Sequence, residues 1–481
     1  MTLFGGSLMA LACLSLLASP WPYLAPLMIF GVFGLIALFR RPAWGLLGLA
    51  ALAPFEGVFR ESLISGAKLL GASLILVLAL QLLLRRLPET RFASNLWRPL
   101  GLFLFCMFLS TLFTENLLYS LNSWRELLIG MTLFGFALLV GRDVNMMALC
   151  RLIALSVAVT CLNAFLSTEY QEEGRAIGLL QDANYFALLI AVALPPAALL
   201  VLHAKKMIPR LFWGGVCLIL LAGMIKTDSR SGLLVALLTC AIGAWQHRDR
   251  LRRARPRHLG IVMLGAAILA PLTLASLPEE YIERVKSLGM LKSSASARQD
   301  PSLGRRASYL LIGAEMIRDN PLLGSGPGNF PLRYERTGYA KLFADTIGQI
   351  DISRRAHNTY LEIFSEMGIP AGLFFVSLIL LALRNFARAR SLWAQKGERE
   401  KSDLVTHLGL SMLAMSLFLM FLSVPNHKYL WMLLALSSVL RARAEETPRK
   451  EERRANDRPA NCAGGLLRES LVPSLPEKAR R

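Results

Sequence analysis

The sequence lacks the patterns by which many soluble, cofactor-dependent enzymes are recognised. It contains no C-x-x-C pair, and its seven cysteines lie in hydrophobic segments or near the C-terminus, so neither a disulfide framework nor a cysteine metal site is indicated. A glycine-rich turn at 324–329 lacks the Lys-Ser/Thr that completes a P-loop. No D-x-D or paired-carboxylate metal motif is recognised in the segments that we place on the outer side below. We therefore expect no metal and no cofactor.

Two further absences concern targeting and symmetry. The first hydrophobic stretch has no basic residues before it, and Ala18-Ser19-Pro20 is a poor cleavage site, so this stretch is predicted to be a retained anchor. No internal repeat is visible, although many transporter folds show one in their hydropathy. This absence disfavours a transporter.

Long apolar segments dominate what is present. The 481 residues are 54% hydrophobic with a net charge of +20, and segments of the roughly 20 apolar residues needed to cross a bilayer recur. The sequence predicts an all-α polytopic integral membrane protein with about 12–14 transmembrane helices and one large loop on the outer face. The candidate spans are centred near residues 11, 31, 49, 76, 106, 133, 158, 194, 218, 239, 267, 375, 413 and 434, the third being short and interrupted by Pro54.

Basic residues divide unequally between alternate loops. One set holds Arg40 and Arg41, four arginines at 85–98, six at 248–257 and a further basic run at 384–401. The other set holds only Arg60, Lys68, Arg125, Arg175, Lys226, Arg230 and Lys428. Cytoplasmic loops are enriched in Lys and Arg, so both termini are predicted to be cytoplasmic. The charge is explained by topology, and we expect no nucleic-acid partner.

The predicted organisation has three parts. Residues 1–170 form N-terminal membrane helices, and residues 171–441 form a membrane domain whose outer loop spans 277–358. Within that loop, Leu310, Ala314 and Ile317 recur at helical spacing, which predicts an amphipathic helix over 306–318 on the membrane surface or over a cavity. A glycine-rich turn follows it, as a plain turn or a phosphate cradle. Residues 442–481 form a charged tail that is expected to be disordered.

The stretch from Arg354 to Glu362 carries the clearest candidate for chemistry. His357 lies at a predicted membrane–water boundary, and histidine can exchange a proton near neutral pH. The alternative is an interfacial anchor. Glu362, five residues further on and about 140° round a helix, is expected to point elsewhere. Arginines in the outer short loops either snorkel to the headgroups or bind phosphate in bidentate fashion.

Several motifs, taken in order, resemble one family. They are Arg175 with Gly178 and Asn184, then Ser229-Arg230-Ser231-Gly232, then Gly324-x-Gly-x-Gly-Asn-Phe330, and finally His357-Asn358 with Gly368. Over residues 170–425 their order and the large preceding loop resemble the O-antigen ligase and O-antigen polymerase superfamily. One departure is the four-residue spacing of Gly368 and Gly372, where such ligases usually have three.

The resemblance implies a metal-independent, inverting glycosyltransferase of the bacterial inner membrane. It would transfer a glycan from undecaprenyl pyrophosphate to an acceptor hydroxyl on the periplasmic face, in lipopolysaccharide or surface polysaccharide biosynthesis. By position, His357 would be the catalytic base. The implied substrate-binding residues are Arg175, Arg230, Arg305, Arg306 and Asn358.

The acceptor stays open at this point. Lipid A-core implies a ligase, a second lipid-linked glycan implies a polymerase, and a protein side chain implies a protein O-glycosylation ligase. A flippase or transporter of lipid-linked glycans is the alternative from another class. It would require ionisable residues in the middle of spans and repeat symmetry.

Overall fold

The computed structural model describes residues 14, 15, 18, 20, 24–59, 65–172, 174–249, 301–342 and 354–446. These residues are almost entirely helical, and the small sheet among them is a two-stranded hairpin. The helices are α2 (Leu24–Arg40), α3 (Ala43–Leu52), η1 (Ala53–Phe59), α4 (Gly66–Leu83), η2 (Glu89–Phe92), α5 (Trp97–Leu112), α6 (Leu117–Val140), α7 (Met146–Leu166), η3 (Thr168–Tyr170), η4 (Gly178–Leu180), α8 (Ala183–His203), α9 (Met207–Lys226), α10 (Arg230–Gln246), α15 (Pro301–Asp319), α16 (Phe330–Glu335), α17 (Gly338–Leu342), α18 (Thr359–Gln395), α19 (Arg399–Phe418) and α20 (Lys428–Glu446).

These helices confirm the prediction of an all-α polytopic membrane protein. Helices lie at twelve of the fourteen predicted centres, and the centres near residues 11 and 267 lie outside the described residues. Among the described helices, six are long and apolar enough to cross a membrane, or up to seven if a bent pair is one span. That pair is α2 and α3, which are bent by 117°. Helices α5 and α10 are shorter, and α19 and α20 carry charged residues at one end.

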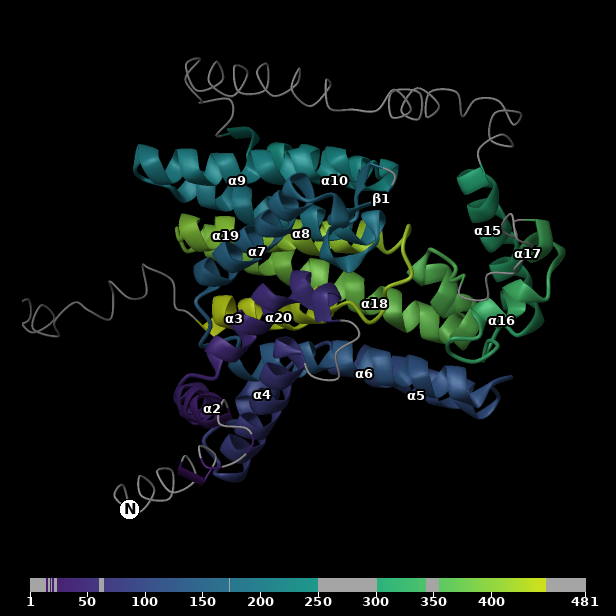
Figure 1. Ribbon diagram of the computed structural model, residues 1–481, viewed down its shortest axis with the longest axis horizontal. Helices are drawn as coiled ribbons and strands as arrows, with labels where there is room; N and C mark the ends of the chain where they lie inside the picture. The colour runs from purple at the N-terminus through teal and green to yellow at the C-terminus, as the bar shows by residue number, and fades with distance from the viewer. Residues whose placement is uncertain are drawn as a thin grey trace, which may run out of the picture.

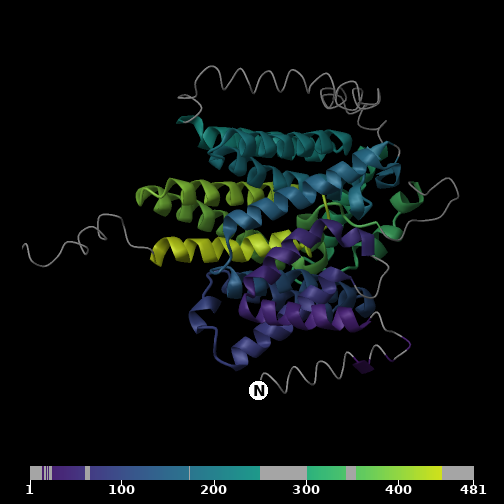
Figure 2. The same cartoon turned by 60° about the vertical axis from the view of Figure 1, so that its left-hand side comes forward.

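Most of the long helices run side by side along the longest axis of the molecule (Figure 1). Helices α9 and α10 form one outer layer, and α4, α5 and α6 lie on the opposite side, as the turned view in Figure 2 also shows. Helix α20 lies between them, where every residue from Tyr429 to Leu440 is buried. A helix that is apolar all round belongs in a core, so α20 is the centre of the bundle.

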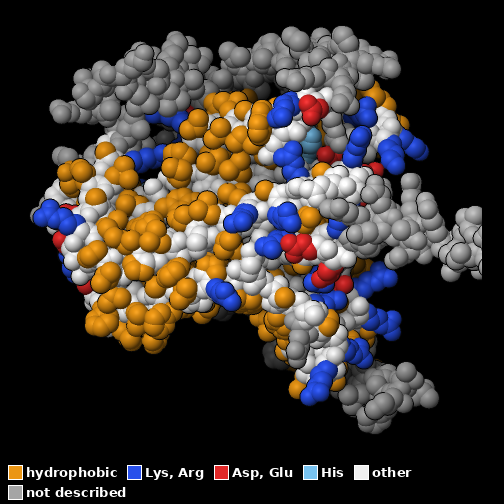
Figure 3. Space-filling model, turned by 180° about the vertical axis from the view of Figure 1, so that it is seen from behind, with side chains coloured by type: hydrophobic (Ala, Val, Ile, Leu, Met, Phe, Trp, Pro, Cys, Tyr) orange, Lys and Arg blue, Asp and Glu red, His pale blue; other side chains and the backbone are white. Residues whose placement is uncertain are grey.

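The two sets of loops that differ in their basic residues lie at opposite ends of the bundle. We call the end with α15, α16, α17 and His357 the motif end, where Arg336 pairs with Glu115 at 2.6 Å. At the other end, the basic end, Arg142 pairs with Glu446 at 2.8 Å and Arg91 pairs with Asp143. Figure 3 shows most Lys and Arg side chains on the right of the rear face, whereas hydrophobic side chains cover much of its left and middle.

The helix predicted over 306–318 is present as α15, and the side that it buries against protein is not the one that carries Leu310 and Ala314, whose predicted place on the membrane surface or over a cavity stays a prediction. Leu310 is 54% exposed, while Tyr309, Ile312 and Met316 are each 2% exposed. The buried residues form a small second core with Phe330 and Tyr334 of α16. Helical spacing identifies an apolar stripe, but it does not tell a stripe that faces protein from one that faces solvent or lipid.

Helix α18 is broken near its start. Gly368 has φ +84° and ψ 169°, which separates a short first segment from the long apolar remainder. A Cβ at Gly368 would lie 2.2 Å from the carbonyl oxygen of Leu322. The break therefore needs glycine, both for its positive φ and for close approach of the 320–330 segment.

Candidate active site

The His-Asn-Thr motif is fixed at the start of α18 by contacts of its two later members. The Asn358 side chain caps the helix by accepting a hydrogen bond from the Leu361 N–H at 3.1 Å. Thr359 donates its N–H to the carbonyls of Leu419 and Leu422 at 2.8 and 2.9 Å, after the end of α19. Asparagine is a favoured helix cap because its side chain satisfies an otherwise unpaired N–H. The motif thus holds His357 in place through its neighbours.

His357 itself has left-handed backbone geometry and a stacked aromatic neighbour. Its φ is +47°, a value uncommon for a residue other than glycine. Its ring stacks on Tyr309 of α15, with centroids 5.8 Å apart and planes at 22°. Tyr309 in turn meets the edges of Phe330 and Tyr334, at 6.3 and 5.1 Å. The second core therefore positions the imidazole.

The surroundings of His357 favour its neutral form. Burial lowers the pKa of His357, and the positive charge of Arg306 lowers it further, while Asp182 opposes the shift and Arg354 adds to it. Burial disfavours the charged imidazolium, and nearby cations do the same. A histidine that stays neutral near neutral pH can accept a proton from a substrate hydroxyl.

The predicted arginines fall into two groups. Arg305 and Arg306 are neighbours on α15, and the charge of Arg306 acts on His357. Arg175 lies in strand β2 (Arg175–Ala176), which pairs with β1 (Gln171–Glu172) in an antiparallel hairpin. Its Nε donates to the carbonyl of Thr227 at 3.2 Å and lies 3.8 Å from an Asp228 carboxylate oxygen. Arg230 begins α10, two residues after Asp228.

The N-terminus of α8 connects the two groups. Asp182, whose charge acts on His357, caps α8 by accepting the Tyr185 N–H at 2.7 Å. Two residues later, Asn184 accepts a hydrogen bond from the Ser229 hydroxyl at 2.8 Å, directly before Arg230. The first turn of α8 thus lies between His357 on one side and the Arg175–Arg230 group on the other.

The glycine-rich turn holds a carboxylate of the protein itself. Gly324, Gly326 and Gly328 all have positive φ, as a turn of this composition predicts. The N–H groups of Gly328 and Phe330 donate to the two carboxylate oxygens of Glu366 at 2.7 and 2.9 Å. Of the two readings of this turn, the geometry favours the structural one, because these N–H groups already bind the Glu366 carboxyl group.

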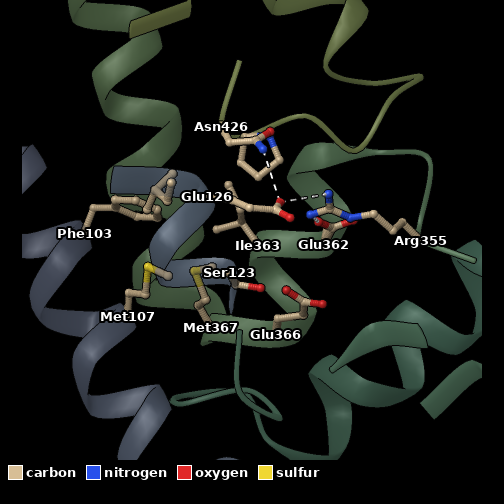
Figure 4. Close-up of a pocket in the computed structure, with 12 residues that line it drawn as sticks. Phe103, Met107, Ser123, Glu126, Arg355, Glu362, Ile363, Glu366, Met367 and Asn426 are labelled. Atoms are coloured by element: carbon tan, nitrogen blue, oxygen red, sulfur yellow. Dashed lines mark hydrogen bonds and ion pairs between the residues drawn. The ribbon is translucent and has the colours of Figure 1, made fainter. Parts of the chain in front are cut away.

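A cluster that sequence reasoning missed lies next to this turn. Arg355 donates to Glu362 at 2.5 Å and lies 3.9 Å from Glu126 of α6, and Asn426 donates to Glu126 at 3.2 Å. Figure 4 shows these side chains around one pocket, with Glu366 on its lower side. Glu362 and Glu366 are four residues apart at the start of a membrane helix. Ionisable residues there are rare, and this was the available signal.

Within the described residues, no three His, Cys, Asp or Glu side chains are placed to hold a metal ion. The motif end combines a histidine that favours its neutral form, arginines that can bind anions, and a polar pocket with carboxylates. All three lie at one end of a helical membrane bundle.

Comparison with known proteins agrees with this class of site. Residues 215–376 match the family model described as O-antigen ligase. The matched segment contains Arg230, Arg305, Arg306, His357 and Asn358, while Arg175 lies outside it. The match confirms the resemblance to the O-antigen ligase and polymerase superfamily, which implies activity of the glycosyltransferase type. No curated protein matches the chain.

Proposed function

We propose that this protein is an inverting, metal-independent glycosyltransferase of the bacterial inner membrane. It takes a glycan from undecaprenyl pyrophosphate and transfers it to an acceptor hydroxyl on the periplasmic face, in lipopolysaccharide or surface polysaccharide biosynthesis. Both termini are cytoplasmic, so the motif end faces the periplasm. The observation that carries the proposal is the half-buried His357, on which the charges of Arg306 and Arg354 act, within the segment that matches the O-antigen ligase family.

The proposed reaction is a single displacement. The acceptor oxygen attacks the anomeric carbon as its proton passes to His357, and the bond from that carbon to the pyrophosphate breaks. Undecaprenyl pyrophosphate leaves with the bonding electron pair, and the configuration inverts. General-base catalysis of this kind contributes on the order of 10²–10⁴-fold.

The arginines have the complementary role of binding the donor and stabilising its leaving group. The charge of Arg306 has the largest electrostatic effect on His357, and Arg305 is its neighbour on α15. Arg306 is proposed to neutralise the pyrophosphate as it departs. Arg175 and Arg230 are proposed to hold the pyrophosphate from the far side of the α8 N-terminus. Planar guanidinium groups match phosphate oxygens in bidentate pairs. Asn358 is proposed to act on substrate binding through the cap that fixes His357.

Three acceptors fit the same chemistry, because only the source of the hydroxyl differs. We favour a ligase that uses lipid A-core. A polymerase that extends a second lipid-linked glycan, or a ligase that glycosylates protein, is the alternative. A flippase for lipid-linked glycans is less favoured, because it leaves the neutral His357 without a role.

The test uses full-length protein purified in detergent with an undecaprenyl-pyrophosphate glycan and three acceptors: lipid A-core, a second lipid-linked glycan and a serine-containing peptide. Wild type, His357→Ala and Arg230→Ala are compared by mass spectrometry of the products. We expect transfer by wild type and loss in both variants, and the productive acceptor identifies the subclass. Equal transfer by His357→Ala would exclude the general-base role. Lipid translocation in liposomes without transfer would support a flippase instead.

A further inference from the structure

A narrow pocket at the motif end is not used by the mechanism above. Helices α5 and α6, the first segment of α18 and the turn before α20 surround it. Figure 4 shows an apolar side with Phe103 and Met107 and a polar side with Glu126, Glu362 and Arg355. The pocket borders the helix that His357 precedes.

One oxygen in this pocket requires a hydrogen-bond donor. Glu362 is 2% exposed, and its Oε1 accepts from Arg355 at 2.5 Å. Its Oε2 is buried and has no hydrogen-bond partner among the described residues. A buried acceptor left unpaired is costly, and more so when it belongs to a charged group. Glu366, by contrast, has both oxygens satisfied by backbone N–H groups.

The charge of the pocket selects against phosphate. The two carboxylates of Glu126 and Glu362 outnumber the single guanidinium of Arg355. An anion would be repelled here, whereas it is attracted to Arg306 and to the Arg175–Arg230 group. The carboxylates accept hydrogen bonds from neutral hydroxyl groups, and the wall of Met107, Ile363 and Met367 suits C–H groups. A sugar carries hydroxyl groups next to an apolar face of C–H groups, and this combination matches the lining of the pocket.

The size of the pocket restricts what enters. It is partly enclosed, and its interior admits about one water-sized group. A hydroxyl or hydroxymethyl group on the edge of a sugar fits this space, whereas a whole sugar ring does not. Glu126 and Arg355, which are about one third exposed, lie where the remainder of such a sugar would be.

We propose that this pocket is the acceptor subsite, in which one hydroxyl or hydroxymethyl group of the acceptor sugar donates a hydrogen bond to Glu362 Oε2. The inference rests on the proposed transferase function and extends it. It assigns the two substrates to different regions, the donor pyrophosphate to the arginines and the acceptor sugar to the carboxylates. It therefore names a sugar, and not a protein side chain, as the acceptor.

The experiment measures transfer kinetics for the sugar acceptor that wild type uses and for its monodeoxy analogues. The variants are Glu362→Gln and Glu126→Gln, and the matched control is Glu115→Gln, which changes a carboxylate at the same end outside the pocket. We expect Glu362→Gln to raise the acceptor KM about 10- to 100-fold, the usual range for a hydrogen bond to a charged group. The donor KM and the control should be unchanged.

The monodeoxy series separates binding of a hydroxyl from general damage. With wild type, one deoxy analogue should raise the acceptor KM as much as the Glu362→Gln substitution raises it for the unmodified acceptor. The two increases should not add when that analogue is tested with Glu362→Gln, because both changes remove the same contact. Losses that add for every analogue, a rise in donor KM alone, or a peptide as the productive acceptor would overturn the proposal. If Glu362→Gln does not fold, the same series of analogues is measured with Glu126→Gln, which changes the more exposed carboxylate of the pocket.

A direct binding measurement keeps the subsite distinguishable from the transferase function. Saturation-transfer difference NMR on the purified chain, with methyl glycosides of glucose, galactose and N-acetylglucosamine, requires no turnover. Binding of a glycoside that disappears in Glu362→Gln and persists in Glu115→Gln supports the subsite even if no transfer is seen. Binding that is absent, or is equal in both variants, overturns it.

Discussion

The two ends of the bundle both place histidines beside charged groups, but they arrange them differently. At the basic end, His203 lies 3.1 Å from Asp403, and the rings of His247 and His407 stack at 5.1 Å. At the motif end, His357 stacks on a tyrosine, and burial together with two arginines lowers its pKa. The pair of His203 with Asp403 joins the end of α8 to α19. A neutral histidine with cations on one side suits proton transfer beside an anionic leaving group.

The largest effect expected from this contrast is on His357. His357→Ala should reduce the transfer rate about 10²–10⁴-fold, because the general base is lost. His203→Ala at the basic end is the matched change and should leave the rate within about twofold, because the His203–Asp403 pair lies at the opposite end of the bundle from His357. The measurement is single-turnover transfer with saturating donor. Equal losses in the two variants would contradict the contrast.

The next effect concerns the arginines. Arg306→Gln should lower kcat/KM for the lipid-linked donor about 10- to 100-fold, as expected when a charged hydrogen bond to phosphate is lost. Arg142→Gln removes an arginine from an ion pair with the exposed Glu446 and should have no measurable effect. Steady-state kinetics with varied donor checks both. If Arg306→Gln left kcat/KM for the donor unchanged, Arg306 would not be part of the pyrophosphate site.

A smaller effect should follow from the aromatic stack. Tyr309→Leu removes the ring that packs on His357 and should lower kcat about 3- to 10-fold, the usual value of an aromatic pair. Tyr309→Phe keeps the ring and should retain most activity. The ratio of the two rates, measured with folding checked by size-exclusion chromatography, tests the positioning role. A loss as large in the Phe variant would point to the hydroxyl instead.

The last prediction is a change in pH dependence. Because the pKa of His357 is lowered from 6.5, its base form dominates near neutral pH, and kcat/KM should fall only as pH drops below that ordinary value. Arg306→Gln removes a nearby positive charge, so the His357 pKa should rise and the acid limb should move to higher pH. Arg142→Gln should leave the limb in place. A limb that persists unchanged in His357→Ala would show that another group titrates.

Much of the fold could be predicted because membrane helices leave long apolar runs in the sequence. The helices at the described centres, the end of α15 at Asp319 and the positive φ of Gly324, Gly326 and Gly328 all follow from local composition. The sharp bend between α2 and α3 falls at Arg41 and Pro42 and was not predicted, whereas Pro54, which was predicted to interrupt the third span, lies after α3 in the 3-10 helix η1. Local patterns thus determined where helices begin and end better than how they meet.

The candidate site was predicted only in part, and the reason is physical. His357 and the arginines stand out because they are charged or titratable at membrane boundaries. The contact between Glu366 and Gly328 joins residues 38 apart in the chain, and the pocket combines α5, α6 and α18. No local pattern encodes such pairings. The roles of Arg175, Arg230, Arg305, Arg306, His357 and Asn358 stay predictions until the variants are measured.

The burial of α20 has a consequence for how the protein is made. It is the last of the described helices to leave the ribosome, yet it occupies the centre of the bundle, where Tyr429 donates its hydroxyl to the Ala50 carbonyl of α3. The earlier helices must therefore insert around a space that is filled only at the end of synthesis. Nascent chains that stop before α20 would lack their interior, and quality-control proteases should remove them while full-length chains mature.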